Sequence, residues 1–473
     1  MAGAGCAVGW VLSSTPPFDH PKKATRELGY LFFPAELILR ALSFVSLPLI
    51  VSSIASSLGA LDYATSSKVM ARVLFYFVVT GLLAMGEAVG ISYAIRPGKY
   101  ALGGNHTNMV TSNAGVEGVD TIDFLMDFFR NLLPDNFITA AFQQVDSLRL
   151  MQTNTVNILG LVVIAVCFGF SVASLHRRKS RPFLVTLDSF SEVSLKLMRV
   201  IVWFYPILVF FMTTRTVILL SDSLENIARF YVYILTICLT VFTHSFVILP
   251  LMYLALTRKN PLKLFLGCFR ALLITFATRN RIASLPATMD CLENLNVSRR
   301  LSRLVAPLGA SINLDGLVIC EVMTALLVVD LRAVDISAKS VAFLAFAALG
   351  LSFCAQSSGA GVVLYVMIFQ TVGLPMDDIA VLVSLDWLVG RIRTATSVWS
   401  DCVGAGIVQH FSRRELLGLD GGVSFQLDGE SVDDLNNTMR DGVAMTNFKQ
   451  NGSSDWTVRL VNESGEQLVV SKV

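Results

Sequence analysis

The sequence is poor in charged residues. Asp, Glu, Lys and Arg make up only 15% of its 473 residues, whereas soluble domains carry roughly 25%. Hydrophobic residues make up 54%, and the mean hydropathy is +0.63. These values predict an integral membrane protein with several spans, not a soluble domain with a single anchor.

Patterns typical of several site classes are also missing. The five histidines are dispersed, and the eight cysteines form no CxxC pair or Cys/His cluster, so neither a metal centre nor a disulfide framework is indicated. We interpret the cysteines as small buried apolar residues. The net charge of +2, without a large basic cluster, does not suggest nucleic-acid binding. No nucleophile–base pair or phosphate-binding loop occurs, so we do not expect an enzyme.

Long apolar segments dominate the first 412 residues. An opening run, 2–13, covers about 18 Å and is too short to cross a hydrocarbon core of roughly 30 Å. No basic flank precedes it, so we expect no cleavable signal peptide. A polar loop with three prolines follows. Membrane helices are then expected at about 31–60, 69–95, 155–175, 183–214, 225–257, 302–330 and 377–412.

Basic residues indicate how these helices are oriented. The basic run 176–181 ends one span. Arg258-Lys259 follow after the chain has crossed the membrane twice more, and Arg413-Arg414 follow the last helix. Basic residues beside spans mark the cytoplasmic side, so we predict that both ends of the chain are cytoplasmic. This orientation places Asn105, in the Asn-His-Thr sequon of the polar interlude 97–154, outside.

Two apolar segments are interrupted by polar residues. Residues 261–297 break at 278–286, and 338–374 break at 356–361; we expect each half to be too short to span. Such segments predict re-entrant hairpins, whose backbone must be satisfied by protein or water. Paired interrupted segments indicate a secondary transporter with its site near the midplane. A pore could also use them, but no TVGYG-like filter occurs. The predicted fold is an all-α membrane protein with about eight transmembrane helices plus two hairpins.

The last helix carries an unusual number of charges. Asp386, Arg393, Ser397 and Asp401 are spaced by seven, four and four residues, so they stack on one helical face. A charge in hydrocarbon is costly unless it is paired or hydrated, which makes this face a candidate functional site. The alternative is a set of internal ion pairs that only locks the helix to its neighbours.

Residues 413–473 are polar and contain no span. We expect a cytoplasmic tail without stable structure. The chain ends in Ser471-Lys472-Val473, which a PDZ-type domain could capture through its carboxylate; an ordinary chain end is the alternative.

Several ordered stretches carry a resemblance to a known family. They are residues 47–53, 134–136 with 143–144, 157–163, 308–316, 372–375 with 377–378, and 386–401. Over about 2–416 the chain resembles the excitatory amino acid transporters, within the dicarboxylate/amino acid:cation symporters. The resemblance implies an elevator-type homotrimer. Residues 1–257 would form mainly the scaffold and trimerisation helices, although the third and sixth helices would contribute to the transport part. Residues 258–412 would form the transport core.

The implied activity is sodium-coupled symport of glutamate, aspartate or related dicarboxylates across the plasma membrane, with a chloride conductance. Arg393 matches the family's carboxylate clamp, a role that suits the planar guanidinium fork. The candidate substrate-binding residues are Arg393, Thr394, Ser397, Arg281 and Gly361. The candidate sodium ligands are Asp315, Asn313, Gly309, Asp401 and Thr80.

Departures from the family pattern cluster at the substrate. The aspartate that holds the substrate ammonium is Gly390 here, and the serine-rich tip of the first hairpin is replaced by 279–282, with Arg281 adding positive charge. Burying an ammonium without its acidic partner is costly, so we hypothesise a pocket that favours carboxylates without an amine or binds glutamate poorly. Other departures are Ser397, Leu314, Leu317, Phe77, Gly81 and a shortened second hairpin tip. The alternative to symport is a transport-poor relative that acts mainly as an anion-conducting channel or assembly subunit.

Overall fold

The computed structural model describes most of the apolar part of the chain and three strands of the tail. The described residues are 2–14, 21–100, 126, 129–142, 144–146, 151–153, 157–214, 218, 231–331, 338–352, 377–413, 415, 444–451, 455–461 and 467–472. Two compact units result, Met1–Arg413 and Arg414–Val473, and each is described by itself. Asn105 and the tip of the second hairpin lie outside the described residues.

The first helices are longer than the apolar pattern predicted. Helix α1 (Ala2–Ser14) is short as expected, whereas α2 (Pro21–Gly59) and α3 (Tyr63–Ile95) begin before their apolar cores. Pro21 therefore starts a helix instead of lying in a loop, because the first helical position needs no N–H donor. The short helix η1 (Pro97–Tyr100) follows α3. In the next polar segment, α5 (Phe137–Phe142) is followed by a β1–β2 hairpin (Gln144–Asp146 and Met151–Thr153).

The next helices contain two irregularities that hydropathy did not predict. After α6 (Ile158–Ser174), α7 (Arg177–Val202) is bent by 54° from the helix Tyr205–Thr214, so the expected helix 183–214 is two pieces. Helices α9 (Tyr231–Thr243) and α10 (Leu249–Thr257) are joined by one π-helical turn, η3 (His244–Ile248). Pro250 has no N–H to donate to the preceding turn, and π-helical turns often mark functional sites.

The first interrupted segment forms two helices that pack against each other, α11 (Pro261–Thr278) and α12 (Arg281–Asn294). Arg279 ends α11 in the left-handed region with φ 53°, and the Asn280 side chain caps α12 by accepting from the N–H groups of Ile282 and Ala283. The expectation that both halves are too short was wrong for α11, which has 18 residues and a hydropathy sufficient for a span.

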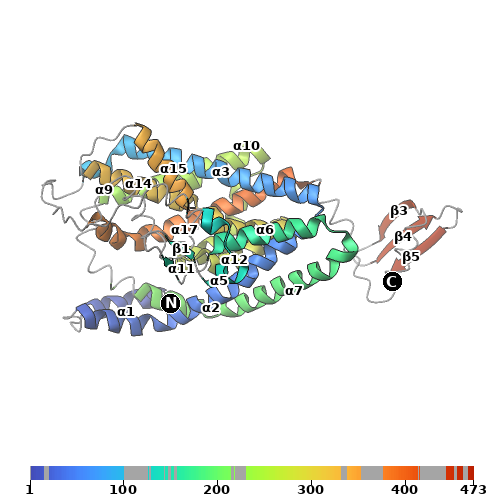
Figure 1. Cartoon of the computed structure of the whole chain (residues 1–473), viewed down its shortest axis with the longest axis horizontal. Helices are drawn as coiled ribbons and strands as arrows, with labels where there is room; N and C mark the ends of the chain where they lie inside the picture. The colour runs from blue at the N-terminus through green and yellow to red at the C-terminus, as the bar shows by residue number, and fades with distance from the viewer. Residues whose placement is uncertain are drawn as a thin grey trace. The chain divides into compact units, whose positions relative to one another are not determined.

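The expected span 302–330 is not one helix. It divides into α13 (Arg299–Ile312) and α14 (Asp315–Leu331), with Asn313 and Leu314 between them. The two pieces are almost entirely buried. Helix α14 packs against α3, α9, α15 (Ala338–Ser352) and α17 (Asp377–Phe411), as Figure 1 illustrates. The last helix is continuous, as the sequence predicted.

Two apolar cores hold the helical unit together. One surrounds α14 and takes buried residues from α3, α9, α15 and Val389 of α17. The other joins α2 and α7 to α12 and α13. Large apolar side chains such as Phe75, Trp203 and Leu266 are exposed on the outside, as expected for a surface covered by lipid. Five helices of the described part are long and apolar enough to span, or six with the bent pair.

The tail does not lack secondary structure, so that expectation was wrong. Strands β3 (Ala444–Asn451), β4 (Asp455–Val461) and β5 (Gln467–Lys472) form an antiparallel sheet in the order β3-β4-β5. Ser471 and Lys472 pair with Thr457 and Trp456 of β4. Capture of the chain end by a PDZ-type groove would therefore require β5 to leave its partner.

Candidate functional site

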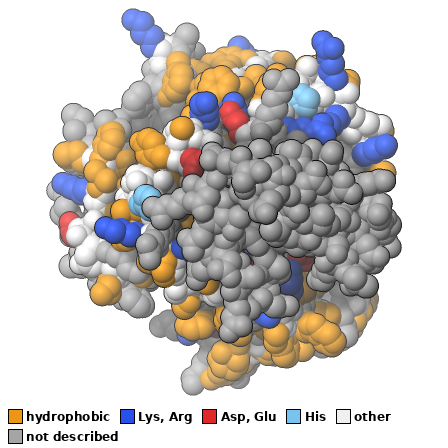
Figure 2. Space-filling model, turned by 90° about the vertical axis from the view of Figure 1, so that its right-hand side faces the viewer, with side chains coloured by type: hydrophobic (Ala, Val, Ile, Leu, Met, Phe, Trp, Pro, Cys, Tyr) orange, Lys and Arg blue, Asp and Glu red, His pale blue; other side chains and the backbone are white. Residues whose placement is uncertain are grey.

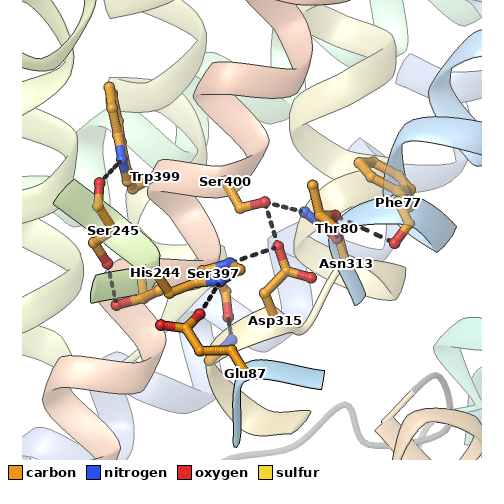
Figure 3. A network of polar contacts seen from close by, with 12 residues as sticks. Phe77, Thr80, Glu87, His244, Ser245, Asn313, Asp315, Ser397, Trp399 and Ser400 are labelled. Carbon is orange, nitrogen blue, oxygen red and sulfur yellow. Dashed lines mark hydrogen bonds and ion pairs between the residues drawn. The ribbon is translucent and has the colours of Figure 1, made fainter. Parts of the chain in front are cut away.

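Polar side chains gather where the break between α13 and α14 meets α3 and α17. The Asn313 side chain donates to Asp401 Oδ1 at 2.9 Å and to Ser400 Oγ at 3.1 Å. Its amide oxygen lies 3.5 Å from Thr80 Oγ1 of α3. All four residues are buried, and Figure 3 shows most of this network. The break thus brings the Asn313 amide to the charged face of α17 and next to a hydroxyl of α3.

A second set of contacts continues the network through Asp315. The Ser400 hydroxyl donates to Asp315 Oδ2, and His244 Nε2 lies 3.7 Å from the same oxygen. On its other side, His244 Nδ1 lies 3.1 Å from Glu87 Oε2 (Figure 3). Sequence reasoning missed Glu87, His244 and Ser400. An ionisable residue inside an apolar span is itself a sign of function. That rule could have identified Glu87 and His244 from the sequence.

Two glycines allow the broken helix to approach α17 this closely. A Cβ at Gly309 would overlap the Asp401 carboxylate, and a Cβ at Gly316 would overlap the backbone carbonyl of Arg393. At the start of α14, the Gly316 N–H donates a hydrogen bond to the Ser397 hydroxyl at 3.3 Å. Glycine is needed here because any side chain would push the two backbones apart.

The donor set suits a hard monovalent cation better than a transition metal. Among the residues that the structure describes, no group of three or more His, Cys, Asp or Glu could hold a metal ion. The other oxygens of this network belong to the Asn313 amide and to the hydroxyls of Thr80 and Ser400. Asn313 lies in the irregular backbone between two half-helices, a feature that is typical of sodium sites in transporters. The structure brings together all five predicted sodium ligands, Asp315, Asn313, Gly309, Asp401 and Thr80.

Positive charge lies beside this cation region. Arg281, the first residue of α12, interacts electrostatically with both Asp401 and Arg393. Its Nη1 atom is buried and has no hydrogen-bond partner among the described residues. Arg393 is only 8% exposed. The Arg281 guanidinium group, with a buried N–H donor that has no partner among the described residues, is a strong binding partner for a carboxylate.

The other predicted substrate residues lie on the same helix but use their hydroxyls within it. Thr394 Oγ1 donates to the carbonyl of Gly390, and Ser397 Oγ donates to that of Arg393 at 3.2 Å. Each hydroxyl has a single hydrogen and already donates it to a backbone carbonyl, so neither is well placed to donate to a carboxylate. Gly361 lies outside the described residues.

The tip of the first hairpin is fastened to its surroundings by backbone contacts. Arg391 Nη1 of α17 donates to the carbonyls of Ala277 at 2.9 Å and Phe276 at 3.2 Å, near the end of α11. The Tyr205 hydroxyl donates to the carbonyl of Ala283 in α12. The hairpin therefore holds Arg281 at a fixed position next to α17.

Comparisons with known proteins identify the family of the chain. A family model described as the sodium:dicarboxylate symporter family matches residues 2–411. The chain is similar to excitatory amino acid transporter 1 of Ambystoma tigrinum, with 32% identity over 83% of this chain and 79% of that protein. It is 32% identical to excitatory amino acid transporter 1 of Mus musculus over 84% of this chain and 80% of the relative. An excitatory amino acid transporter of Caenorhabditis elegans is also 32% identical, over 83% of each chain.

Proposed function

The chain belongs to the sodium:dicarboxylate symporter family, and from this membership we propose that it carries acidic amino acids or related dicarboxylates across the plasma membrane, driven by sodium. The family and the relatives are transporters, not enzymes. The apolar helices make the chain a multi-pass membrane protein. Neither the family nor the relatives give support to a transport-poor anion channel, so we do not pursue that alternative.

One observation carries the proposal: a buried acid, Asp401, and a partly buried arginine, Arg281, interact across the cation and anion regions. Arg281 is attracted by Asp401 and repelled by Arg393. A sodium ion at Asp401 neutralises the carboxylate that attracts Arg281, which leaves the guanidinium group available to a substrate carboxylate. A bound anion in turn offsets the positive charge that Arg281 and Arg393 place near the cation. Each ligand thereby raises the affinity for the other.

We further propose that some helices move during transport and that the others form a fixed scaffold. Residues 258–412, with α3, α9 and α10, would form the part that moves, and the other helices in 1–257 would form a scaffold within a homotrimer. Support comes from the apolar core that joins α2 and α7 to α12 and α13, because packed apolar helices can slide past one another by small steps. A chloride conductance is proposed from the resemblance alone.

The membrane orientation is also proposed. Both ends of the chain would be cytoplasmic, since the basic residues 177–179, Arg258 and Arg413 follow the expected spans at intervals of two crossings. Figure 2 shows Lys and Arg side chains on the face that it draws. A PDZ-type partner at the chain end stays a prediction that depends on release of β5.

The experiment is uptake into proteoliposomes that contain the purified full-length protein. Labelled L-aspartate, L-glutamate and succinate are offered with an inward sodium gradient and, as a control, with choline in place of sodium. We expect concentrative uptake of at least one of them only with sodium. Uptake of none, by protein that elutes as a single species from a sizing column, would contradict the proposed function.

A further inference from the structure

The π-helical turn η3 between α9 and α10 leaves one of its own carbonyls without a backbone donor. The N–H of Leu249 donates to the carbonyl of His244, five residues earlier. In the same register the carbonyl of Ser245 would accept from residue 250, but Pro250 has no N–H. Because a buried carbonyl without a donor is costly, this turn needs a hydrogen-bond donor from outside its own helix.

Trp399 of α17 supplies this donor. Its indole N–H donates to the carbonyl of Ser245 at 2.9 Å in a buried contact (Figure 3). Trp399 is only 2% exposed, and Phe265 of α11 packs against it edge to face, with the ring centroids 5.3 Å apart. A buried indole that is packed in this way keeps its N–H on one acceptor. Helix α17 therefore fixes the position of the π-helical turn.

The side chain of His244, the first residue of the turn, is held from a third helix. Its Nδ1 atom lies 3.1 Å from Glu87 Oε2 of α3, and both side chains are buried. A carboxylate on one ring nitrogen fixes the orientation of an imidazole, as outer carboxylates do for histidines at metal sites. The other ring nitrogen, Nε2, lies 3.7 Å from Asp315 Oδ2.

These contacts determine which oxygen of Asp315 faces the candidate sodium ligands of α3. Oδ2 contacts the imidazole of His244 and accepts from the hydroxyl of Ser400. Oδ1 faces α3 instead, since a Cβ built at Gly81 would lie 4.0 Å from it. The residue before Gly81 is Thr80, one of the candidate ligands. A carboxylate held in this orientation presents Oδ1 to a cation without first having to rotate.

We propose that Glu87 and Trp399 are positioning residues for the sodium ligand Asp315. Trp399 holds the backbone of the π-helical turn, Glu87 holds the imidazole of His244, and the imidazole keeps the Asp315 carboxylate in the orientation that a cation needs. The inference rests on the proposed function, because it takes Asp315 as a sodium ligand. Loss of such an outer partner typically lowers metal affinity by about 10- to 100-fold.

The melting temperature of the purified full-length protein tests the inference, measured while sodium chloride replaces choline chloride at constant ionic strength. The value without sodium reports the stability of the fold, and the dependence of its rise on sodium concentration gives the sodium dissociation constant. Trp399→Phe keeps an aromatic ring against Phe265 but removes the N–H. We expect it to raise the sodium dissociation constant by about tenfold.

Two substitutions at Glu87 separate its contact with the ring from its charge. Glu87→Ala removes the partner of His244 Nδ1 and should raise the sodium dissociation constant by about tenfold. Glu87→Gln keeps an amide that can donate to or accept from the ring, so its constant should stay within about threefold of the wild-type value. Both variants lack the charge, so a difference between them reports the contact with His244.

Tyr233→Phe is the matched control for these variants. Tyr233 also lies in α9, and its buried hydroxyl lies 2.6 Å from the hydroxyl of Thr324 in α14. Its loss removes a buried aromatic hydrogen bond from the same helix without touching the π-helical turn. We expect a lower melting temperature in choline and an unchanged sodium dissociation constant.

The outcomes separate the inference from the proposed function. Sodium dissociation constants within about twofold of wild type in both Trp399→Phe and Glu87→Ala overturn the inference, because the turn then only stabilises the fold. Equal losses in Glu87→Ala and Glu87→Gln also overturn it, because charge would then act instead of the contact with His244. A wild-type protein that sodium stabilises no more than choline does refutes sodium coupling itself, and the inference with it.

Discussion

The cation region and the arginine region of this protein are built in different ways. Around Asn313, polar groups from three helices satisfy one another through amide, hydroxyl and carboxylate contacts. Around Arg281, a buried donor atom has no hydrogen-bond partner in the described part of the chain. The first region has its ligand oxygens already ordered, whereas the second holds unused positive charge. A site for a small cation needs fixed oxygens, and a site for an organic anion needs donors that its ligand completes.

The largest effect is expected in the arginine region. Arg393→Ala removes the predicted carboxylate clamp and should weaken substrate binding by at least about a hundredfold, because a buried charge-assisted pair is lost. Calorimetry with succinate and L-aspartate measures the loss, and surface labelling in cells checks that the protein reaches the membrane. Arg270→Ala, at an exposed position of α11, is the control. Unchanged binding of both ligands would reject the assignment of the clamp.

The cation region should respond to sodium more than to substrate identity. Asp401→Asn keeps the shape of the side chain but removes its charge, and should raise the half-saturating sodium concentration by about thirtyfold. The ratio of succinate to L-aspartate affinity should stay nearly the same. Asp290→Asn, in the partly exposed pair with Arg199, is the matched control. A sodium dependence identical to that of the wild type would count against Asp401 as a ligand.

Close contact between α14 and α17 can be broken without touching any charge. In Gly316→Ala the new methyl group overlaps the carbonyl of Arg393, so the helices must separate, at a cost of about 1–3 kcal/mol. We expect a lower melting temperature and weaker sodium binding. Gly350→Ala, where nothing lies within 4 Å of the new Cβ, should leave both unchanged or slightly raise stability. Equal melting temperatures of the two variants would show that the overlap is relieved without cost.

The smallest effect is expected for a hydroxyl that only supports the ligands. Ser400→Ala removes the donor to Asp315 and the acceptor for Asn313. A hydrogen bond to a charged carboxylate contributes about 1.5 kcal/mol or more, so sodium affinity should fall by about tenfold. Ser43→Ala, an exposed serine whose hydroxyl donates only to the carbonyl of Leu39 four residues earlier, is the control. A larger loss than for Asp401→Asn would reverse the proposed roles.

The sequence predicted the elements that one-dimensional patterns determine. The face of α17 that carries Arg393, Ser397 and Asp401 followed from spacing, whereas the side chain of Asp386 lies outside the described part. The first hairpin followed from its polar interruption. The break at Asn313 and Leu314 was not predicted, because a polar pair inside an apolar run fits either a continuous or a broken helix. The gap depends on contacts with Asp401 and Ser400, which are distant in sequence.

Other features depend on contacts that no local pattern reveals. The approach of Arg279 to Gly390 joins residues more than a hundred positions apart. The π-helical turn places His244 between Glu87 and Asp315. The sheet in the tail was missed because a polar composition was taken to exclude strands, although β3, β4 and β5 pair along most of their lengths.

The most direct test of the account is the affinity for succinate as a function of sodium concentration. If the cation and anion regions are electrostatically coupled through Asp401 and Arg281, sodium must strengthen succinate binding. We expect the dissociation constant of succinate to fall by at least about tenfold between about 1 and 100 mM sodium at constant ionic strength, a coupling of about 1.4 kcal/mol. A dissociation constant that is independent of sodium, for wild-type protein that binds succinate, would contradict it.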